Sequence, residues 1–166
     1  MNFVSILLGS KSDHDIIKYC IDTLEKFDVK YEIVVSSALK SPKRTEQYIK
    51  DAEKKGAVVF IVASQMVSHL SGATSALTTK PVIALPIKSD DINSTEIMLS
   101  TLQMPAGLPV STVSLGKSGA INAAYFAMQI LAIRDKELSV KLKEDRIVQA
   151  KKVETDSKEI EVLISI

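Results

Sequence analysis

Short apolar runs of strand length recur along the chain, and longer segments with helical spacing of apolar residues separate them. The runs are rich in valine and isoleucine and almost continuously hydrophobic, which is typical of strands covered on both faces of a parallel sheet. The predicted strands are Phe3 to Leu8, Tyr31 to Ser36, Val58 to Ala63, Pro81 to Leu85 and Val110 to Leu115. The predicted helices are Asp13 to Phe27, Pro42 to Lys55, Ser71 to Thr78, Asn93 to Leu102, and Ser118 to about Lys152. This alternation predicts an α/β fold, a three-layer αβα sandwich around a mainly parallel, doubly wound sheet.

The end of the chain differs from the rest. Beyond about residue 152 the helical periodicity is lost, and the last residues, Glu161 to Ile166, are mostly apolar. One small domain has little reason to leave such a run in water, so we expect it to pack against another surface, such as a neighbouring subunit. We therefore predict a single domain over residues 1–152 and a C-terminal tail over residues 153–166.

Composition and charge narrow the class of protein. A chain of 166 residues with 46% hydrophobic and 25% charged residues is long enough for one well-buried core. Its 21 basic and 20 acidic residues are scattered and give a net charge of +1, so no basic stripe indicates a nucleic-acid partner. No apolar run approaches the ~20 residues of a membrane-spanning helix, and no secretory signal opens the chain. We expect a cytoplasmic protein with no membrane partner, in which the single cysteine, Cys20, is a small buried hydrophobe.

The loops after the predicted strands carry the candidate binding residues, because ligands of open parallel sheets bind beyond the carboxyl ends of the strands. The first loop, Gly9-Ser10-Lys11-Ser12-Asp13, combines a turn glycine with hydroxyls and free amides at a helix N-terminus, which suits a phosphate. It is neither a dinucleotide fingerprint nor a Walker A loop. A plain turn followed by an N-cap fits the same residues, so this loop alone leaves both interpretations open. In the second loop, Ser36 to Pro42, Lys40 either reaches that phosphate or is a solvated surface lysine.

The loop after the third strand, Ala63 to Gly72, contains Ser68 and His69. A lone histidine is more often structural than catalytic, but its place after a strand makes His69 a candidate for proton transfer. The other histidine, His14, falls on the first turn of a helix and is expected to face solvent. No group of histidine, cysteine and carboxylate residues has metal-ligand spacing, so we expect neither a metal ion nor another cofactor.

Two later segments contain rigid or small residues. Gln103 to Pro109 holds two prolines and a glycine in a turn before the last strand, and Gly116 to Ala124 starts a helix with small residues. Small residues permit close packing of a helix against a sheet or against another subunit. For these small residues we favour the structural interpretation.

In their order along the chain, these loops resemble those of the PurE family of purine biosynthesis, the phosphoribosylaminoimidazole carboxylase catalytic subunits, also called N5-carboxyaminoimidazole ribonucleotide mutases. The resemblance covers roughly residues 3 to 145. It rests on three motifs at matching spacing, which are Gly9 to Asp13, Gln103 to Gly107 and Gly116 to Ala124. It implies a homo-octamer in which each ribonucleotide pocket is built at subunit contacts.

The resemblance also implies roles for single residues of this chain. Ser10 and Ser12, next to Gly9, would hold the 5′-phosphate of a phosphorylated aminoimidazole ribonucleotide, and Asp13 would hold its ribose hydroxyls. The Ser37-Ala38 pair and the third loop with Ser68 would contact the aminoimidazole ring and its carboxyl group. Lys40 would keep the charge of the family's arginine while giving up its bidentate fork.

The chain departs from the family in two loops. The family's Ser-Ala-His-Arg-Thr-Pro is Ser37 to Pro42 here, with Leu39 in place of the histidine that in the family shuttles a proton to and from the ring carbon. Leucine cannot transfer a proton, and general acid–base catalysis is worth roughly 10²–10⁴-fold. In the third loop, Gln65 and Met66 add bulk where the family has glycines, whereas His69 matches.

The resemblance implies an isomerase or lyase of purine biosynthesis, a carboxyaminoimidazole ribonucleotide mutase or carboxylase, with His69 as the histidine that remains to move a proton. One alternative is a divergent relative that binds a ribonucleotide or another phosphate ester and catalyses a different reaction or none. A third hypothesis is a structural or regulatory subunit that keeps the octamer without turnover. Leu39, together with Gln65 and Met66, is the feature that separates these hypotheses.

Overall fold

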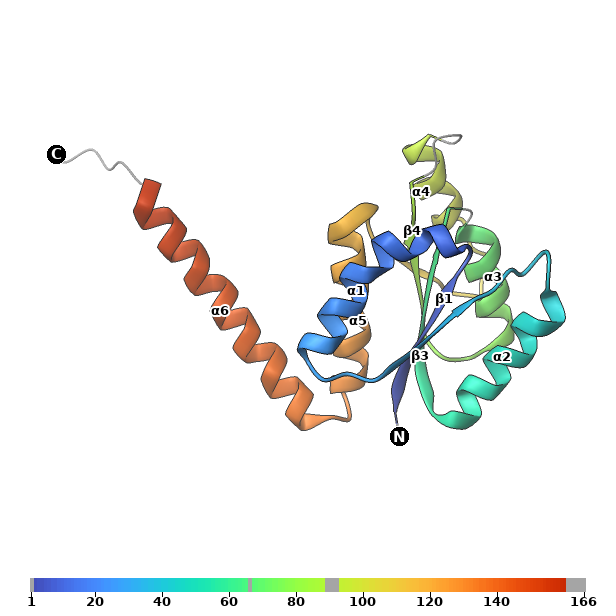
Figure 1. Ribbon diagram of the computed structural model, residues 1–166, viewed down its shortest axis with the longest axis horizontal. Coiled ribbons are helices and arrows are strands. Elements are labelled where there is room, and N and C mark those ends of the chain that lie inside the picture. The colour runs from blue at the N-terminus through green and yellow to red at the C-terminus, as the bar shows by residue number, and fades with distance from the viewer. Residues whose placement is uncertain (1, 66, 89–92, 161–166) are drawn as a thin grey trace.

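The computed structural model describes residues 2–65, 67–88 and 93–160, except for the side chains of residues 67 and 68. Within these residues, a five-stranded sheet lies between helices on both of its faces (Figure 1). The strands are β1 (Phe3–Leu8), β2 (Tyr31–Val35), β3 (Ala57–Ser64), β4 (Val82–Pro86) and β5 (Ser111–Thr112). The helices are the short 3-10 helix η1 (Lys11–Asp13) and the α-helices α1 (His14–Lys26), α2 (Pro42–Lys55), α3 (Val67–Leu77), α4 (Ser94–Leu102), α5 (Gly116–Ala132) and α6 (Lys136–Ile160).

The strands follow the order β2-β1-β3-β4-β5, and every neighbouring pair is parallel. This order places a topological switch point between β1 and β3, where the crossover helices leave for opposite faces of the sheet. The α/β sandwich with a doubly wound parallel sheet that the hydrophobic pattern predicts is therefore confirmed.

The core has two halves, one on each face of the sheet. Val4 and Ile6 of β1 pack with apolar residues of α1 and α5, whereas Phe3 and Leu7 pack with residues of α2 and α3. This alternation follows from the two-residue period of a strand. The expectation that strands are covered on both faces is wrong for the edge strand β2, where side chains such as Val35 are 43% exposed.

Small residues let α5 lie close to the sheet. A Cβ atom on Gly119 would fall 1.6 Å from the carbonyl oxygen of Ser114, so this position accepts only glycine. The alanines Ala120, Ala123, Ala124 and Ala127 are fully buried inside the same chain. The structural interpretation of this segment is confirmed, because these residues serve packing within one subunit.

The predicted helix from Ser118 to about Lys152 is two helices. α5 ends at Ala132, and α6 begins at Lys136, where Asp135 Oδ1 accepts the Leu138 N–H at 3.0 Å. No glycine or proline marks this turn, so the hydrophobic pattern runs through it without a visible break.

The predicted loss of helix beyond residue 152 is wrong, because α6 continues to Ile160. Local bonds support this polar stretch, including the ion pair between Lys152 and Asp156 at 3.0 Å. The apolar run over residues 161–166 lies outside the described residues, and the division of the chain at 152/153 stays a prediction.

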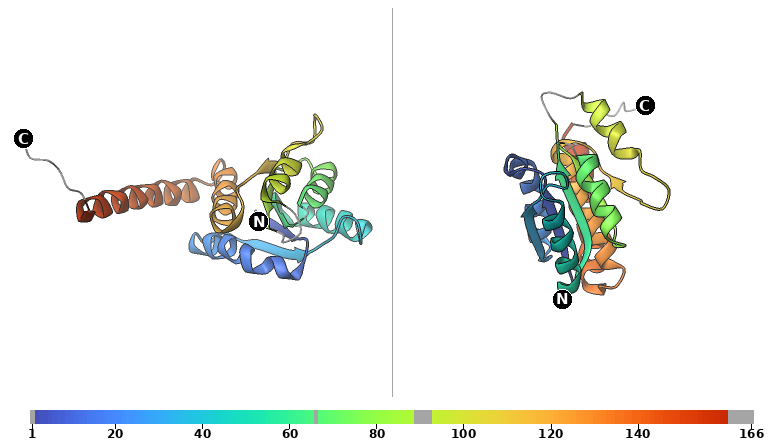
Figure 2. Two further views of the ribbon diagram at one scale, coloured as in Figure 1. Left: turned by 90° about the horizontal axis from the view of Figure 1, so that it is seen from above. Right: turned by 90° about the vertical axis from the view of Figure 1, so that its right-hand side faces the viewer.

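Helix α6 starts close to the end of α5 and extends away from the sandwich, as Figure 1 and the left view of Figure 2 show. Along its 25 residues, only Leu138 and Asp145 are buried. Among the described residues, no helix combines the length and the apolar character needed to cross a membrane.

Candidate functional site

The loops that follow β1, β2 and β3 surround a cavity of about 360 Å³ at the carboxyl ends of these strands. This is the place at which an open parallel sheet binds ligands, next to the switch point between β1 and β3. The residues that line it are Gly9, Ser10, Ser12, Asp13, Ser36, Ser37, Ala38, Leu39, Lys40, Ser64, Gln65, His69 and Leu70. The structure thus brings nearly all of the site residues predicted from the sequence to one cavity.

Gly9 allows β1 and β3 to end close together. A Cβ atom at this position would fall 2.2 Å from Ser64 Oγ and 3.4 Å from Asp13 Oδ2. Glycine is therefore required by packing against the end of β3, which brings the first loop down onto the sheet edge.

The backbone of the first loop hydrogen-bonds largely to its own side chains. The Ser10 N–H donates to Asp13 Oδ2 at 2.8 Å, and the Ser12 N–H donates to Ser10 Oγ at 3.3 Å. The expectation that these two amides are free for a phosphate is wrong, because this reciprocal cap already uses them. The two hydroxyls remain exposed beside the cavity, with 3.0 Å between Ser10 Oγ and Ser12 Oγ.

Asp13 forms part of the cavity wall although it is only 1% exposed. Its Oδ2 accepts the Ser10 N–H, but its Oδ1 is buried without a hydrogen-bond partner, alone among the side-chain atoms of the described part of the chain. Burial raises the pKa of the Asp13 carboxyl, and the Ser10 N–H offsets only part of that effect.

The second loop presents an apolar side chain where the resemblance places a histidine. Leu39 borders the cavity and is 71% exposed, and Lys40 beside it is also exposed. The Lys40 N–H donates to Ser37 Oγ at 3.1 Å, and the Ser41 N–H donates to the Ser37 carbonyl at 2.9 Å. These bonds hold the loop in a turn with Leu39 at its tip.

The third loop is shorter than predicted, because α3 begins at Val67 and not at Ser71. His69 therefore lies on the first turn of a helix, exposed and next to the cavity. Gln65, directly after β3, is exposed at the cavity as well. Ser68 lies on the same turn as His69, but its side chain is outside the described part, and so is Met66.

Sequence reasoning missed three residues at the cavity. Ser36, Ser64 and Leu70 line it without having been singled out. Their position along the chain could have indicated two of them, because Ser36 and Ser64 are the polar residues at which the second and third apolar runs end. Ser36 has a structural partner, because its hydroxyl lies 2.7 Å from Thr45 Oγ1 in the core.

The motif from Gln103 to Gly107 does not line this cavity. Its residues are mostly exposed between α4 and β5, and Gly107 has a φ of 89°, which favours glycine. In a single chain this motif is a rigid surface turn.

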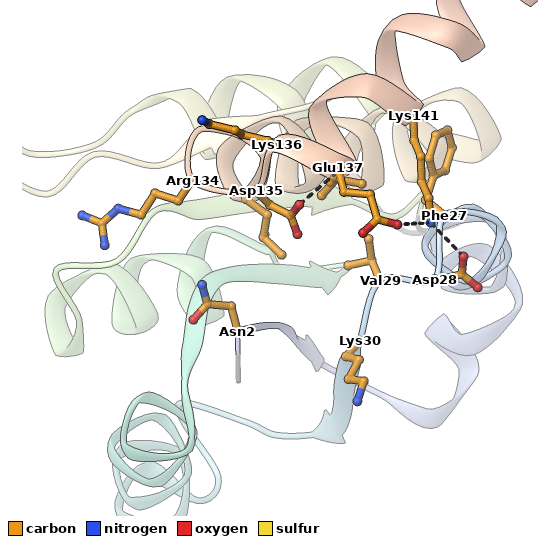
Figure 3. A pocket seen from close by; sticks show the side chains of 12 residues that line it. Asn2, Phe27, Asp28, Val29, Lys30, Arg134, Asp135, Lys136, Glu137 and Lys141 are labelled. Atoms are coloured by element: carbon orange, nitrogen blue, oxygen red, sulfur yellow. Dashed lines mark hydrogen bonds and ion pairs between the residues drawn. The ribbon is translucent and has the colours of Figure 1, made fainter.

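A larger cavity of about 660 Å³ opens at the other end of the sheet, against the turn between α5 and α6 (Figure 3). Three of its charged groups pair with one another, because Lys141 Nζ lies 3.0 Å from Asp28 and 3.6 Å from Glu137. Figure 3 shows Arg134 and Lys30 extending away from each other. Polar groups do not converge there, so volume alone does not make this cavity the functional site.

Neither cysteine chemistry nor metal binding is suggested by the described residues. They contain no cluster of three or more histidine, cysteine, aspartate or glutamate side chains placed to hold a metal ion. Cys20 is buried, and burial raises the pKa of its thiol to about 12, which keeps it in the unreactive thiol form.

Comparisons with known proteins agree with this arrangement. The family model for AIR carboxylase matches residues 3–152. The N5-carboxyaminoimidazole ribonucleotide mutase of Bacillus subtilis (strain 168) is 42% identical over 143 residues, which cover 86% of this chain and 88% of that protein. The protein of the same name from Pyrococcus abyssi is 44% identical over 143 residues, which cover 86% of this chain and 81% of that protein. The crystal structure of Treponema denticola PurE matches with a TM-score of 0.88 and 26% identity, covering 98% of this chain and 100% of that one. This chain therefore belongs to the AIR carboxylase family.

Proposed function

We propose that this chain is an N5-carboxyaminoimidazole ribonucleotide mutase of purine biosynthesis. The observation that carries the proposal is the cavity in which the first, second and third loops meet at the switch point of the sheet. The relatives with this activity in their names align over most of both chains. The cavity has the concave shape and the few convergent polar groups expected of a small-molecule site.

Each face of the cavity suits one part of such a ribonucleotide. The hydroxyls of Ser10 and Ser12 and the ammonium of Lys40 offer donors to a 5′-phosphate, and Asp13 offers an acceptor to the ribose hydroxyls. The Ser37-Ala38 loop and the third loop would contact the aminoimidazole ring and its carboxyl group.

Calorimetry with a ribonucleoside 5′-monophosphate tests the phosphate position. Ser12→Asp should abolish binding, because a carboxylate would then face the phosphate beside Ser10. Ser118→Asp, which adds the same charge at an exposed position of α5 that does not line the cavity, is the matched control. Unchanged affinity in Ser12→Asp would show that the anion binds elsewhere.

Leu39 leads us to expect a low catalytic rate. A leucine at the tip of the second loop cannot exchange a proton, so turnover should be low and should depend on His69. Leu39→His with Lys40→Arg rebuilds the family's loop and should raise kcat by about 100-fold. Assays of both variants and the original protein with the N-carboxylated ribonucleotide, and with the free amine plus carbon dioxide, distinguish mutase from carboxylase. Brisk conversion by the original protein that survives His69→Asn would contradict these roles.

We also propose that the chain assembles as a homo-oligomer. The resemblance to the family indicates an octamer. Helix α6 leaves apolar side chains in water along its length, including Ile147 at 55% and Val153 at 69% exposed. The exposed motif from Gln103 to Gly107, outside its own chain's cavity, is then free to reach a neighbouring subunit. Light scattering at micromolar concentration tests the assembly, and a monomer would remove this proposal.

We place the protein in the cytoplasm. Its single cysteine is a buried free thiol, so the fold does not depend on an oxidising compartment. Fractionation of cells that express the full chain tests the location, and recovery with membranes would contradict it.

A further inference from the structure

A carboxyl group distinguishes the ribonucleotides of a mutase from the free amine that a carboxylase takes together with carbon dioxide. A pocket that prefers the carboxylated ligands must offer hydrogen-bond donors to a carboxylate. When the free amine binds instead, those donors lose their partner, and this loss is what makes such a pocket selective. The donors that line the cavity therefore determine which of these ligands it prefers.

Several polar side chains of the cavity have other roles. The hydroxyls of Ser10 and Ser12 and the ammonium of Lys40 are the proposed donors to the 5′-phosphate. The hydroxyl of Ser36 lies 2.7 Å from Thr45 Oγ1 in the core. A carboxyl group on the ring must therefore be bound by other lining residues.

Ser37, Gln65 and His69 also line the cavity and can donate a hydrogen bond. Ser37 Oγ already accepts the Lys40 N–H at 3.1 Å, and His69 is the proposed proton-transfer group. The side chain of Gln65 is exposed at the cavity and has no hydrogen-bond partner among the described residues. Its amide thus keeps two N–H donors and one carbonyl acceptor for a ligand.

The backbone before Gln65 is held in place by neighbouring segments. The Gly9 N–H donates to the Ala63 carbonyl at 2.9 Å, and the Ile87 N–H donates to the Ser64 carbonyl at 3.1 Å. These bonds tie the end of β3 to the first loop and to the residue that follows β4. The side chain of Gln65 therefore leaves from a fixed position at the edge of the cavity, while its amide is free to turn toward a ligand.

We propose that Gln65 is a specificity-determining residue of this pocket. Its side-chain N–H groups donate to the carboxyl group of the ribonucleotide, which favours carboxylated ligands over the free amine. The proposal rests on the mutase function proposed above. A neutral amide suits this role, because it donates to a carboxylate without losing a proton and so leaves proton transfer to His69. A glycine, which the family has here, has no side chain to make this contact.

Calorimetry with two ligands that differ in the carboxyl group measures this preference. The first is the product of the mutase reaction, which carries the group on its ring carbon, and the second is the free amine. Gln65→Ala should weaken binding of the product by about 10-fold, since a hydrogen bond to a charged group is lost, and change binding of the free amine by less than about 2-fold. Gln65→Glu, which replaces the N–H donors with a negative charge, should lower the preference for the product further.

The free amine is the internal control, because a merely structural role of Gln65 would weaken both ligands by the same factor. Gln47→Ala is the matched variant. It removes the same amide from an exposed position of α2 that does not line the cavity, so both affinities should equal those of the original protein.

The possible failures of the two proposals are distinguishable. If Gln65→Ala changes both affinities by the same factor, or changes neither, Gln65 does not bind the carboxyl group and the mutase function still stands. Tighter binding of both ligands by Gln65→Ala would show that Gln65 only occupies space, which also overturns its role. Binding of neither ligand by the original protein would overturn the mutase function and the role of Gln65 together.

Discussion

Asp13 in the pocket and Asp145 at the junction of α1, α5 and α6 are both buried aspartates, but their surroundings are opposite. Asp145 accepts hydrogen bonds from Lys26 Nζ at 2.5 Å, from the Tyr125 hydroxyl at 2.6 Å and from Gln149. Asp13 accepts one backbone N–H, and its second oxygen has no partner. Burial raises the pKa of both groups. At Asp145 the three hydrogen bonds outweigh burial and hold the pKa below its usual range, whereas at Asp13 burial prevails.

The difference separates a carboxylate that joins helices from one that lines the candidate binding cavity. At the junction, every oxygen of the carboxylate is used to join three helices, so a ligand could add nothing. In the wall of the cavity, the protein leaves one buried oxygen unsatisfied, which costs stability. Neither burial nor residue type distinguishes the two aspartates, and only the count of their partners does.

The largest expected effect is at the junction. Asp145→Ala should lower the free energy of unfolding by about 2–3 kcal/mol, because Tyr125 and Gln149 lose their acceptor in a half-buried site, while exposed Lys26 regains water. Urea unfolding at pH 7 measures this. Asp156→Ala, which breaks only an exposed pair with Lys152, should change stability by less than about 0.5 kcal/mol.

Asp145 should also affect how the free energy of unfolding changes at acidic pH. Its folded-state pKa is below the unfolded value, so its contribution is present above about pH 4 and is lost as pH falls through the lower folded pKa. Asp145→Asn should unfold with a shallower dependence on pH below about 4. Equal slopes in the two proteins would show that the junction does not hold an ionised carboxylate.

Gly9→Ala should cost about 1–3 kcal/mol, because the new methyl group would collide with Ser64 where β1 and β3 end. If the collision is the cause, Ser64→Gly should make the alanine at position 9 less costly. A double-mutant cycle by urea unfolding measures this coupling. Additive effects would mean that backbone conformation, and not the contact with Ser64, requires glycine here.

Tyr125→Phe should destabilise the protein by about 1 kcal/mol, since one of three hydrogen bonds to Asp145 is lost and the other two remain. The ring itself, in edge contact with Phe27 at 5.7 Å between centroids, keeps its packing. A loss as large as that of Asp145→Ala would show that the hydroxyl, and not the carboxylate, organises the junction.

The smallest expected effect concerns Asp13 and has the opposite sign. Its folded-state pKa is above the unfolded value, so its stabilising contribution is present at low pH and is lost as pH rises through the folded pKa. Asp13→Asn does not titrate and should therefore gain stability relative to the original protein as pH rises above about 4. Thermal unfolding across this range measures the difference, and a constant difference would contradict an ionisation cost at Asp13.

Local sequence signals, such as apolar runs, prolines and glycines, were sufficient to predict most of the helices and strands. Helix α2 begins and ends where Pro42 and Gly56 predict, because proline suits a first turn and Gly56 takes a φ of 113° at the helix end. Where the chain carries no such residue, prediction failed, as at the turn between α5 and α6. Strand β5 pairs with β4 over only two residues, although the apolar run that predicts it is longer.

Loop position in the sequence also predicted which residues share the cavity, because the ends of parallel strands meet at one edge of the sheet. It did not predict how the first loop uses its amides. Ser10 and Ser12 were expected to offer free N–H groups, but the side chains of Asp13 and Ser10 take them. Short polar side chains compete for nearby backbone groups, and only three-dimensional geometry shows which partner is chosen.

The sequence by itself determined the class of fold, the three loops of the site and the presence of leucine where a histidine was expected, since each depends on residue type at a position along the chain. Only the tertiary structure decided which buried carboxylate is satisfied. Asp145 finds Lys26, which lies 119 residues away in the sequence, whereas Asp13 closes a local cap and leaves Oδ1 alone. Burial and hydrogen bonding are properties of the packed chain, and they set the directions in which the pKa values of these two carboxyl groups shift.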